Sequence, residues 1–364
     1  MRQHIDPDLF NKLQKYGTGE WNECFHCGNC TALCPLTEDG NLFPRKQISL
    51  LQIGLKEEIV ASTEPWLCYY CGDCSKSCPR DANPGELMMS LRRWLTSKYD
   101  WTGLAGLFYK SLPALIVGFI LVAVAIIVAG VTQTSSTEEL VHFGHQFELW
   151  SIISVFSLIL LPNILRMFWF TIIKEKVKAP LSSYIGGFFT FLYHMFFQRN
   201  YLKCDDNTTR WFMHFLIVAG YLLLLFTTVF LNWFDKEATP FIVWLGYIVG
   251  SFVFFFTFIF IIARSQKKKE NTKYSHPTDW LFIIWLFLMG LTAFIVRLLI
   301  DTDSIENNIW LYYIHLIVLA QWAILIVPFG KWAHFLYRPF AVYFSHLKNA
   351  AAKKQTKINL ILTS

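Results

Sequence analysis

Two cysteine-rich runs near the N-terminus are the part of this 364-residue chain best suited to chemistry. Each run reads C-x₂-C-x₂-C-x₃-C-P, at residues 24–35 and 68–79. Thiolates at this spacing hold 4Fe–4S clusters, three on one cluster and the fourth on the other. The sequence therefore predicts a first cluster held by Cys24, Cys27, Cys30 and Cys78, and a second held by Cys68, Cys71, Cys74 and Cys34.

The main alternative for these cysteines is a pair of zinc sites. Zinc is usually held by two well-separated pairs of ligands, whereas four closely spaced cysteines precede a proline here. Gly28 and Gly72, in the tight part of each run, let the backbone approach a cluster closely. Because the chain has no recognisable flavin or molybdenum motif, we expect the clusters to carry electrons and not to transform a substrate.

The segments after each cysteine run show apolar residues at helical spacing. Pro44 can begin a helix, and the stripe that follows it consists of Ile48, Leu51, Leu55 and Ile59. A second stripe follows Pro84 and consists of Leu87, Leu91, Trp94 and Leu95. No alternating strand pattern accompanies them. We therefore expect residues 1–105 to form an all-helical ferredoxin domain around the two clusters.

The rest of the chain has the composition of a membrane protein. Hydrophobic residues make up 54% of the sequence and charged residues only 16%, well below the usual quarter. Six apolar runs each approach the ~20 residues that cross a bilayer as a helix. They cover residues 111–131, 147–170, 211–231, 241–263, 279–300 and 309–329. The sequence thus predicts an all-α chain in which residues 106–345 form a six-span transmembrane bundle.

Basic residues are sorted to one side of these runs. Lys236 is the one Lys or Arg in the loops after the first, third and fifth runs, and most of the others lie in the opposite loops and the tail. Such an asymmetry places both termini in the cytosol. The polar N-terminus has no signal-peptide core, and a reducing compartment argues against disulfides. We expect a multi-pass protein of the cytoplasmic membrane.

Two segments on the cytosolic side remain to be assigned. Residues 181–198 are apolar but flanked by Lys178 and Arg199, and an even number of spans favours a helix lying at the membrane surface. A seventh crossing is the alternative. Residues 346–364 are expected to form a basic cytosolic tail, solvated near anionic membrane lipid.

Histidines inside apolar spans are costly and by default mark function. His214 begins the third run, and His334 follows the sixth on the same membrane face, so the two could hold one haem b from both sides. His315 lies near the outer end of the sixth run. Nineteen residues from His315 to His334 rise about 28 Å, which is too far for one haem but suits two. An ideal helix turns their side chains about 100° apart, and Pro328 could change that angle.

The second, outer haem has no obvious second ligand. His142 and His145 lie three residues apart at the outer start of the second run, and His145 is the preferred partner of His315. Arg297 could contact a haem propionate or a quinone oxygen, or it could be a snorkelling side chain paired with Asp301. These residues are compatible with either one haem b or two.

These motifs together resemble known components of electron-transfer complexes. The two-cluster part resembles the C component of heterodisulfide reductases, and the spans resemble the E component and the cytochrome b component of respiratory nitrate reductases. The carrying residues are Arg210 to His214, His276 with Pro277, Arg297, and Pro328 to His334, together with Gln198 to Cys204. A single chain with both parts is similar to the C component of quinone-interacting membrane-bound oxidoreductase complexes, over nearly its whole length.

The resemblance implies haem b in the membrane and menaquinone as redox partner. It also implies cytosolic flavin and iron–sulfur subunits, similar to the A or B components of heterodisulfide reductases, and a bacterial inner membrane. In these families the haem ligands lie on the spans that match the third and sixth here, which corresponds to His214, His334 and His315. The sequence departs from nitrate reductases at Leu224, where they have a second histidine.

The functional expectation is a membrane-anchored electron-transfer subunit of a quinone-linked oxidoreductase. Electrons would pass between cytosolic partners and the menaquinone pool through two 4Fe–4S clusters and haem b. The alternative is a membrane-tethered iron–sulfur redox sensor or assembly factor, which needs no haem. A complete reductase is disfavoured because no substrate or flavin site is recognisable, and nothing in the sequence indicates nucleic-acid binding.

Overall fold

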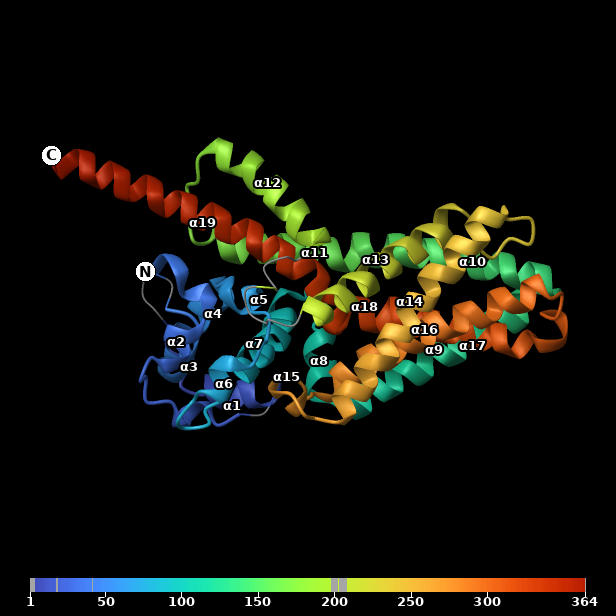
Figure 1. Cartoon of the computed structure of the whole chain (residues 1–364), viewed down its shortest axis with the longest axis horizontal. Helices are drawn as coiled ribbons and strands as arrows, with labels where there is room; N and C mark the ends of the chain where they lie inside the picture. The colour runs from blue at the N-terminus through green and yellow to red at the C-terminus, as the bar shows by residue number, and fades with distance from the viewer. Residues whose placement is uncertain (1–3, 18, 41, 198–201, 203–207, 364) are drawn as a thin grey trace.

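The computed structural model describes residues 4–17, 19–40, 42–197, 202 and 208–363. These residues contain helices and no strand, which confirms the all-α expectation. Short helices of the N-terminal part gather at one end of an elongated molecule, and the long helices run from there to the far end (Figure 1). The C-terminal helix returns over the N-terminal part.

The N-terminal part is built from eight helices, most of them short. They are α1 (Leu9–Gln14), α2 (Asn29–Leu33), α3 (Arg45–Ile53), α4 (Lys56–Ala61), α5 (Glu64–Leu67), α6 (Asp73–Lys76), α7 (Pro84–Tyr99) and α8 (Leu104–Lys110). Helix α7 begins at Pro84, whose fixed φ suits the first helical position. Along α7, Leu87, Leu91 and Leu95 are fully buried, as their spacing predicts.

The apolar stripe after Pro44 differs from the expected single helix. Gly54 adopts the left-handed conformation, with φ 84°, and ends α3 through hydrogen bonds to the carbonyls of Leu50 and Leu51. A side chain at Gly54 would also meet the Asp6 carbonyl oxygen at 2.5 Å. The stripe is therefore split between α3 and α4, although Ile48 and Ile59 both remain in the core.

In the part of the chain that the structure describes, six helical segments are long and apolar enough to cross a membrane, as the sequence predicts. They are α9 (Leu112–Gln133), residues Thr137–Ile173, α13 (Thr208–Phe230), α14 (Pro240–Ser265), α16 (Pro277–Asp301) and residues Glu306–Phe329. The second segment contains α10 (Thr137–Val155) and α11 (Leu161–Phe168), with π-helical turns at Phe156–Leu160 and Trp169–Ile173. It begins ten residues before the expected start, so His145 lies inside the helix.

The ambiguous segment forms α12 (Leu181–Phe196), which is not among the six candidate spans. It packs along α19 (His334–Thr363), where the rings of Phe191 and Phe340 are 4.8 Å apart. Gly187 permits this approach, because a Cβ there would lie 3.0 Å from the Tyr343 ring. This packing is consistent with a helix on the surface of the bundle. Residue 198, the last of the expected segment, and Cys204 lie outside the described residues.

The sixth span and the C-terminal helix meet at a sharp break. The span contains α17 (Ile309–Gln321), a π-helical turn (Trp322–Ile326) and α18 (Val327–Phe329), and it ends before Gly330. A Cβ at Gly330 would be 2.7 Å from the Ile326 carbonyl oxygen. His334 therefore begins a separate helix, α19, and the angle expected from one ideal helix does not apply.

Helix α19 continues without interruption across the expected boundary between residues 345 and 346. The expected tail was solvated, but its Lys348 side chain contacts the N-terminal part. Lys348 Nζ donates to the Ala61 carbonyl at 2.7 Å. A single apolar core, which includes Trp66 of the N-terminal part and Leu286 of the spans, joins the two regions.

Candidate functional site

The two cysteine runs adopt the same backbone conformation. In each run the residue before the second cysteine has a positive φ, 60° at His26 and 55° at Tyr70. Gly28 and Gly72 follow with φ of 86° and 96°, and each precedes a short helix, α2 or α6. Glycine adopts the φ angles seen at Gly28 and Gly72 without strain, because it has no Cβ. These two glycines therefore permit the tight loops that bring the thiols together.

The thiols form two neighbouring groups. Burial raises the pKa of Cys30, and the thiols of Cys24, Cys27 and Cys78 raise it further, so these four lie close together. Burial likewise raises the pKa of Cys34 to about 12, with Cys68, Cys71 and Cys30 adding to the effect. The pKa of Cys74 is raised by burial and then by Cys68, Cys71, Cys34 and Cys30. The thiols of the two predicted groups therefore lie side by side, and which of them share a cluster stays a prediction.

Among the residues that the structure describes, no three His, Cys, Asp or Glu side chains converge closely enough for one ion. None of the eight described cysteines is in a disulfide. The preference for iron–sulfur clusters over zinc rests on the spacing of the cysteines, which is that of a two-cluster ferredoxin.

Two arginines hold the backbone of the second cysteine run. Arg338, on α19, donates to the carbonyls of Trp66 at 3.1 Å and Cys68 at 2.7 Å. Arg92, on α7, also donates to the Cys68 carbonyl and, at 2.7 Å, to that of Pro65. Both guanidinium groups therefore place positive charge beside the expected second cluster. Neither arginine stands out in the sequence, because Arg92 is 24 residues and Arg338 is 270 residues from Cys68.

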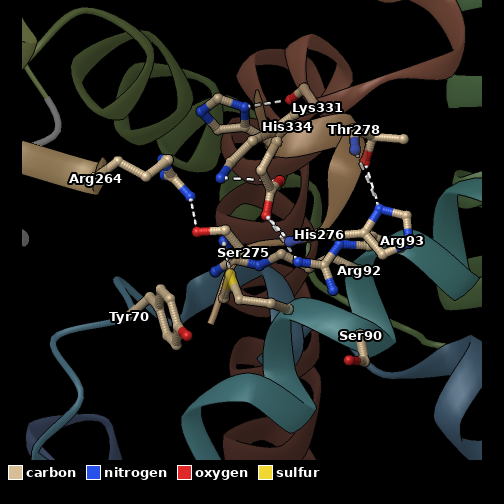
Figure 2. Close-up of polar contacts among 12 residues, drawn as sticks. Tyr70, Ser90, Arg92, Arg93, Arg264, Ser275, His276, Thr278, Lys331 and His334 are labelled. Atoms are coloured by element: carbon tan, nitrogen blue, oxygen red, sulfur yellow. Dashed lines mark hydrogen bonds and ion pairs between the residues drawn. The ribbon is translucent and has the colours of Figure 1, made fainter. Parts of the chain in front are cut away.

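A buried ion-pair network lies beside this contact and joins α7 to the spans. Arg93 pairs with Glu86 at 3.0 Å and with Asp279 of α16 at 2.9 Å, and Lys331 pairs with Asp279 at 3.1 Å. Burial lowers the pKa of Arg93, but Asp279 and Glu86 outweigh it and raise the pKa overall. Figure 2 shows Arg93, Lys331 and His334 converging at this junction. The network fixes the N-terminal part against α16 and against Lys331, which lies in the turn before α19.

His214 and His334 line one cavity, as their membrane positions predict. The cavity measures about 100 Å³ and lies between α13, α14, α16 and the start of α19. Its other walls are apolar and aromatic, including Phe282, Trp322 and Trp332. The His334 Nδ1 donates to the Lys331 carbonyl at 2.5 Å, which leaves Nε2 as its acceptor nitrogen (Figure 2). A second bond of this kind orients the imidazole ligands of metals.

His315 lines a second cavity of about 230 Å³, between α10, α13, α16 and α17. His145, its expected partner, is not among the residues lining that cavity. Glu148, one turn further along α10, lines it instead and accepts a hydrogen bond from Thr228 at 3.0 Å. The sequence carried a signal for Glu148, since it is an acidic residue inside an apolar run.

Arg297 pairs with Asp301, which was one of the two alternatives that the sequence left open. It is buried, and its Nη2 pairs with Asp301 at 2.5 Å. Its Nη1 donates to the carbonyl oxygens of Trp233 and Asp235, the latter at 2.7 Å. Arg297 lines neither histidine cavity. These contacts tie the loop after α13 to α16.

Comparison with known proteins identifies the N-terminal region. Residues 20–82 match the family described as "4Fe-4S dicluster domain". These residues form a 4Fe–4S dicluster domain. The match covers both cysteine runs and confirms the expected iron–sulfur clusters, although it leaves the ligand set of each cluster as a prediction.

The dicluster domain is also similar to parts of curated proteins. A protein of Archaeoglobus profundus, named as similar to the C component of heterodisulfide reductase, is 33% identical over 94 residues, which is 26% of this chain and 50% of that protein. The C component of the H(2):CoB-CoM heterodisulfide,ferredoxin reductase of Methanothermobacter thermautotrophicus is 34% identical over 64 residues, or 18% of this chain and 35% of the relative. The chain thus spans half or less of these relatives. No solved structure matches the chain.

Proposed function

We propose that this chain is a membrane-anchored electron-transfer subunit. It passes electrons between cytosolic flavin and iron–sulfur subunits and the menaquinone pool of a bacterial inner membrane. One 4Fe–4S cluster is held by Cys24, Cys27, Cys30 and Cys78, and the other by Cys68, Cys71, Cys74 and Cys34. His214 and His334 hold haem b, which accepts and donates single electrons within the bilayer.

Helix α19 is the single observation that carries this proposal. His334 faces the cavity shared with His214, and Arg338, four residues later, bonds the carbonyl of Cys68. Four residues rise about 6 Å along a helix. The expected haem and the second cluster are therefore attached to successive turns of one rigid element, which suits electron transfer and has no evident use in a protein that only senses iron or redox state.

The exposure of the cysteines supports an order for the carriers. Cys27 of the first group is exposed, and the neighbouring Phe25 is 60% exposed. Cys68 of the second group is buried against α7 and α19. We infer that a soluble partner docks beside the first cluster and that the second cluster faces the membrane part. The names of the relatives, which are components of larger reductases, agree with a docked partner.

The donor set beside α19 is suited to haem. Two imidazoles from two helices face one apolar cavity, and the Lys331 carbonyl holds His334 with Nε2 available. The cavity of about 100 Å³ is smaller than the ~300 Å³ at which ligand pockets usually begin. Binding of haem therefore requires the aromatic side chains of the lining to move outward. The outer haem with His145 gains no comparable support.

The test is the haem content of full-length chain purified from membranes. We expect a b-type reduced-minus-oxidised spectrum and about eight irons per chain in the clusters. His334→Ala and His214→Ala should each abolish this haem signal and leave the cluster iron unchanged. His346→Ala, on the same helix α19, is the matched control and should keep both.

Three results would contradict the proposal. Zinc in place of iron would overturn the cluster assignment, and unchanged haem in both variants would overturn the ligands. A flat haem spectrum from iron-replete protein would remove the membrane carrier and favour a tethered sensor or assembly factor.

A further inference from the structure

The cavity that contains His315 and Glu148 has the features of a binding site for a small amphipathic ligand. Its volume of about 230 Å³ exceeds the 150 Å³ of an engineered apolar cavity that binds benzene. The walls are mostly apolar, with His315 from α17, Glu148 from α10 and Tyr221 from α13 as the ionisable groups. Both side chains are buried. A ring of one or two fused cycles fits this space.

Hydrogen bonds around His315 determine what its ring can offer. The Thr292 hydroxyl donates to the Leu288 carbonyl at 2.7 Å, so its oxygen accepts from His315 Nδ1 at 2.9 Å. The proton of the neutral imidazole is then on Nδ1, and Nε2 is an acceptor. The Glu148 carboxylate, which already accepts from Thr228, is an acceptor too. The cavity thus presents hydrogen-bond acceptors on two different helices.

Two acceptors call for a ligand with two donors. A hydroquinone ring has one hydroxyl donor at each end and an apolar body between them. A haem is a poorer match, because iron favours a second imidazole and this cavity supplies a carboxylate and Leu224 instead. We infer that this cavity binds the ring of a quinol, with one hydroxyl donating to His315 Nε2 and the other to Glu148. This inference rests on the proposed function for its quinone partner.

The lining of the cavity also reaches the lipid-facing surface at one residue. Phe156 lines it and is 48% exposed, at the start of the first π-helical turn of the second span. Trp322 and Ala323 line it from the π-helical turn of the sixth span. Such turns occur frequently at functional sites. A quinol could therefore enter sideways from the bilayer and leave its isoprenoid tail among lipids.

The cavity adjoins the expected haem site. Tyr221, Trp322 and Trp332 line both cavities, and Trp322 Nε1 donates to the Tyr221 hydroxyl at 3.3 Å. One layer of aromatic side chains separates the two spaces. By contrast, the groove of about 680 Å³ between α9 and α16 offers Gln321 and Ser275. The Gln321 amide already bonds Phe119 and Trp285, and the Ser275 hydroxyl already accepts from Arg264. The larger groove therefore has no ionisable pair like His315 and Glu148.

The test measures binding of a short-chain naphthoquinol to full-length chain in nanodiscs, without oxygen, by quenching of tryptophan fluorescence. Glu148→Gln should weaken binding about tenfold, the equivalent of one hydrogen bond to a charged group. Ala293→Phe, which fills the cavity from α16, should weaken binding even if Glu148→Gln perturbs folding. Ala123→Phe fills the groove between α9 and α16 and should leave the affinity unchanged.

His315→Leu separates a quinol site from a second haem. The inference expects weaker naphthoquinol binding with unchanged haem content. Loss of haem in His315→Leu, unchanged affinity in both Glu148→Gln and Ala293→Phe, or weaker binding in Ala123→Phe alone would overturn it. Because the fluorescence readout does not require haem, a chain that lacks haem but keeps Glu148-dependent affinity would overturn the haem proposal and leave this site standing.

Discussion

Arg93 illustrates how much of this molecule depends on single buried charges. Its side chain is 6% exposed and lies between Glu86 and Asp279, whereas Arg80 and Glu23 form an exposed pair at 2.5 Å. Exposed pairs contribute about 0–1 kcal/mol to stability, but removing one partner of a buried pair costs about 3–5 kcal/mol. The two arginines therefore provide a matched comparison.

Arg93→Met should destabilise the folded chain by about 3–5 kcal/mol, because Glu86 loses its ion-pair partner while Asp279 keeps Lys331. Burial already raises the pKa of Glu86, and loss of Arg93 raises it further. A raised carboxyl pKa favours the folded state at low pH, so the loss should grow as the pH rises from the ordinary pKa of a glutamate toward the raised pKa of Glu86. The midpoint of thermal loss of cluster absorbance measures both effects.

Arg80→Met is the control for this substitution and should move the midpoint little at any pH. Adding Glu86→Gln to Arg93→Met should recover part of the loss and remove its pH dependence. Equal effects of the two single variants would show that the buried network does not stabilise the junction.

The positions of the candidate site residues depend on where helices end, notably at Gly54 and before Gly330. The cysteine spacing and the six apolar runs are local patterns, so the sequence was sufficient to predict the dicluster domain and the number of spans. The break at Gly54 is fixed by the Asp6 carbonyl oxygen, and that at Gly330 by the carbonyl oxygen of Ile326 four residues earlier. The contact of Gly54 with Asp6 is tertiary, and the sequence alone does not reveal it. The pairing of Arg338 with Cys68 was missed for the same reason.

Gly330→Ala tests the break between the sixth span and α19. A Cβ there would lie 2.7 Å from the Ile326 carbonyl oxygen, so the backbone must shift and carry His334 with it. We expect haem content to fall severalfold while cluster iron remains. The haem-to-iron ratio of purified chain is the measurement. Gly186→Ala on α12, where a Cβ meets nothing within 4 Å, should leave the ratio unchanged, and equal ratios in both variants would reject this role of Gly330.

On the scale of the whole molecule, the dicluster domain and the spans form one unit. Besides the Arg93–Asp279 pair, Lys348 bonds Ala61, Asn83 bonds Tyr274 at 3.1 Å, and Arg338 bonds Cys68, so polar contacts join the two regions at several separate places. The apolar core is continuous between them. A charge supplied by the C-terminal helix can therefore set the properties of a cluster held by the N-terminal domain.

Arg338→Met tests this coupling across the molecule. A cation beside Cys68 stabilises the reduced, more negative cluster, and cluster potentials respond to charge and hydrogen bonding. If the contact contributes ~1.4 kcal/mol, the potential of the second cluster should fall by about 59 mV. A redox titration followed by electron paramagnetic resonance measures it. Arg80 lies two residues after Cys78, a predicted ligand of the first cluster. Arg80→Met should therefore leave the potential of the second cluster unchanged. An unaltered potential in Arg338→Met, with both clusters present, would mean that α19 holds the domain in place without tuning its chemistry.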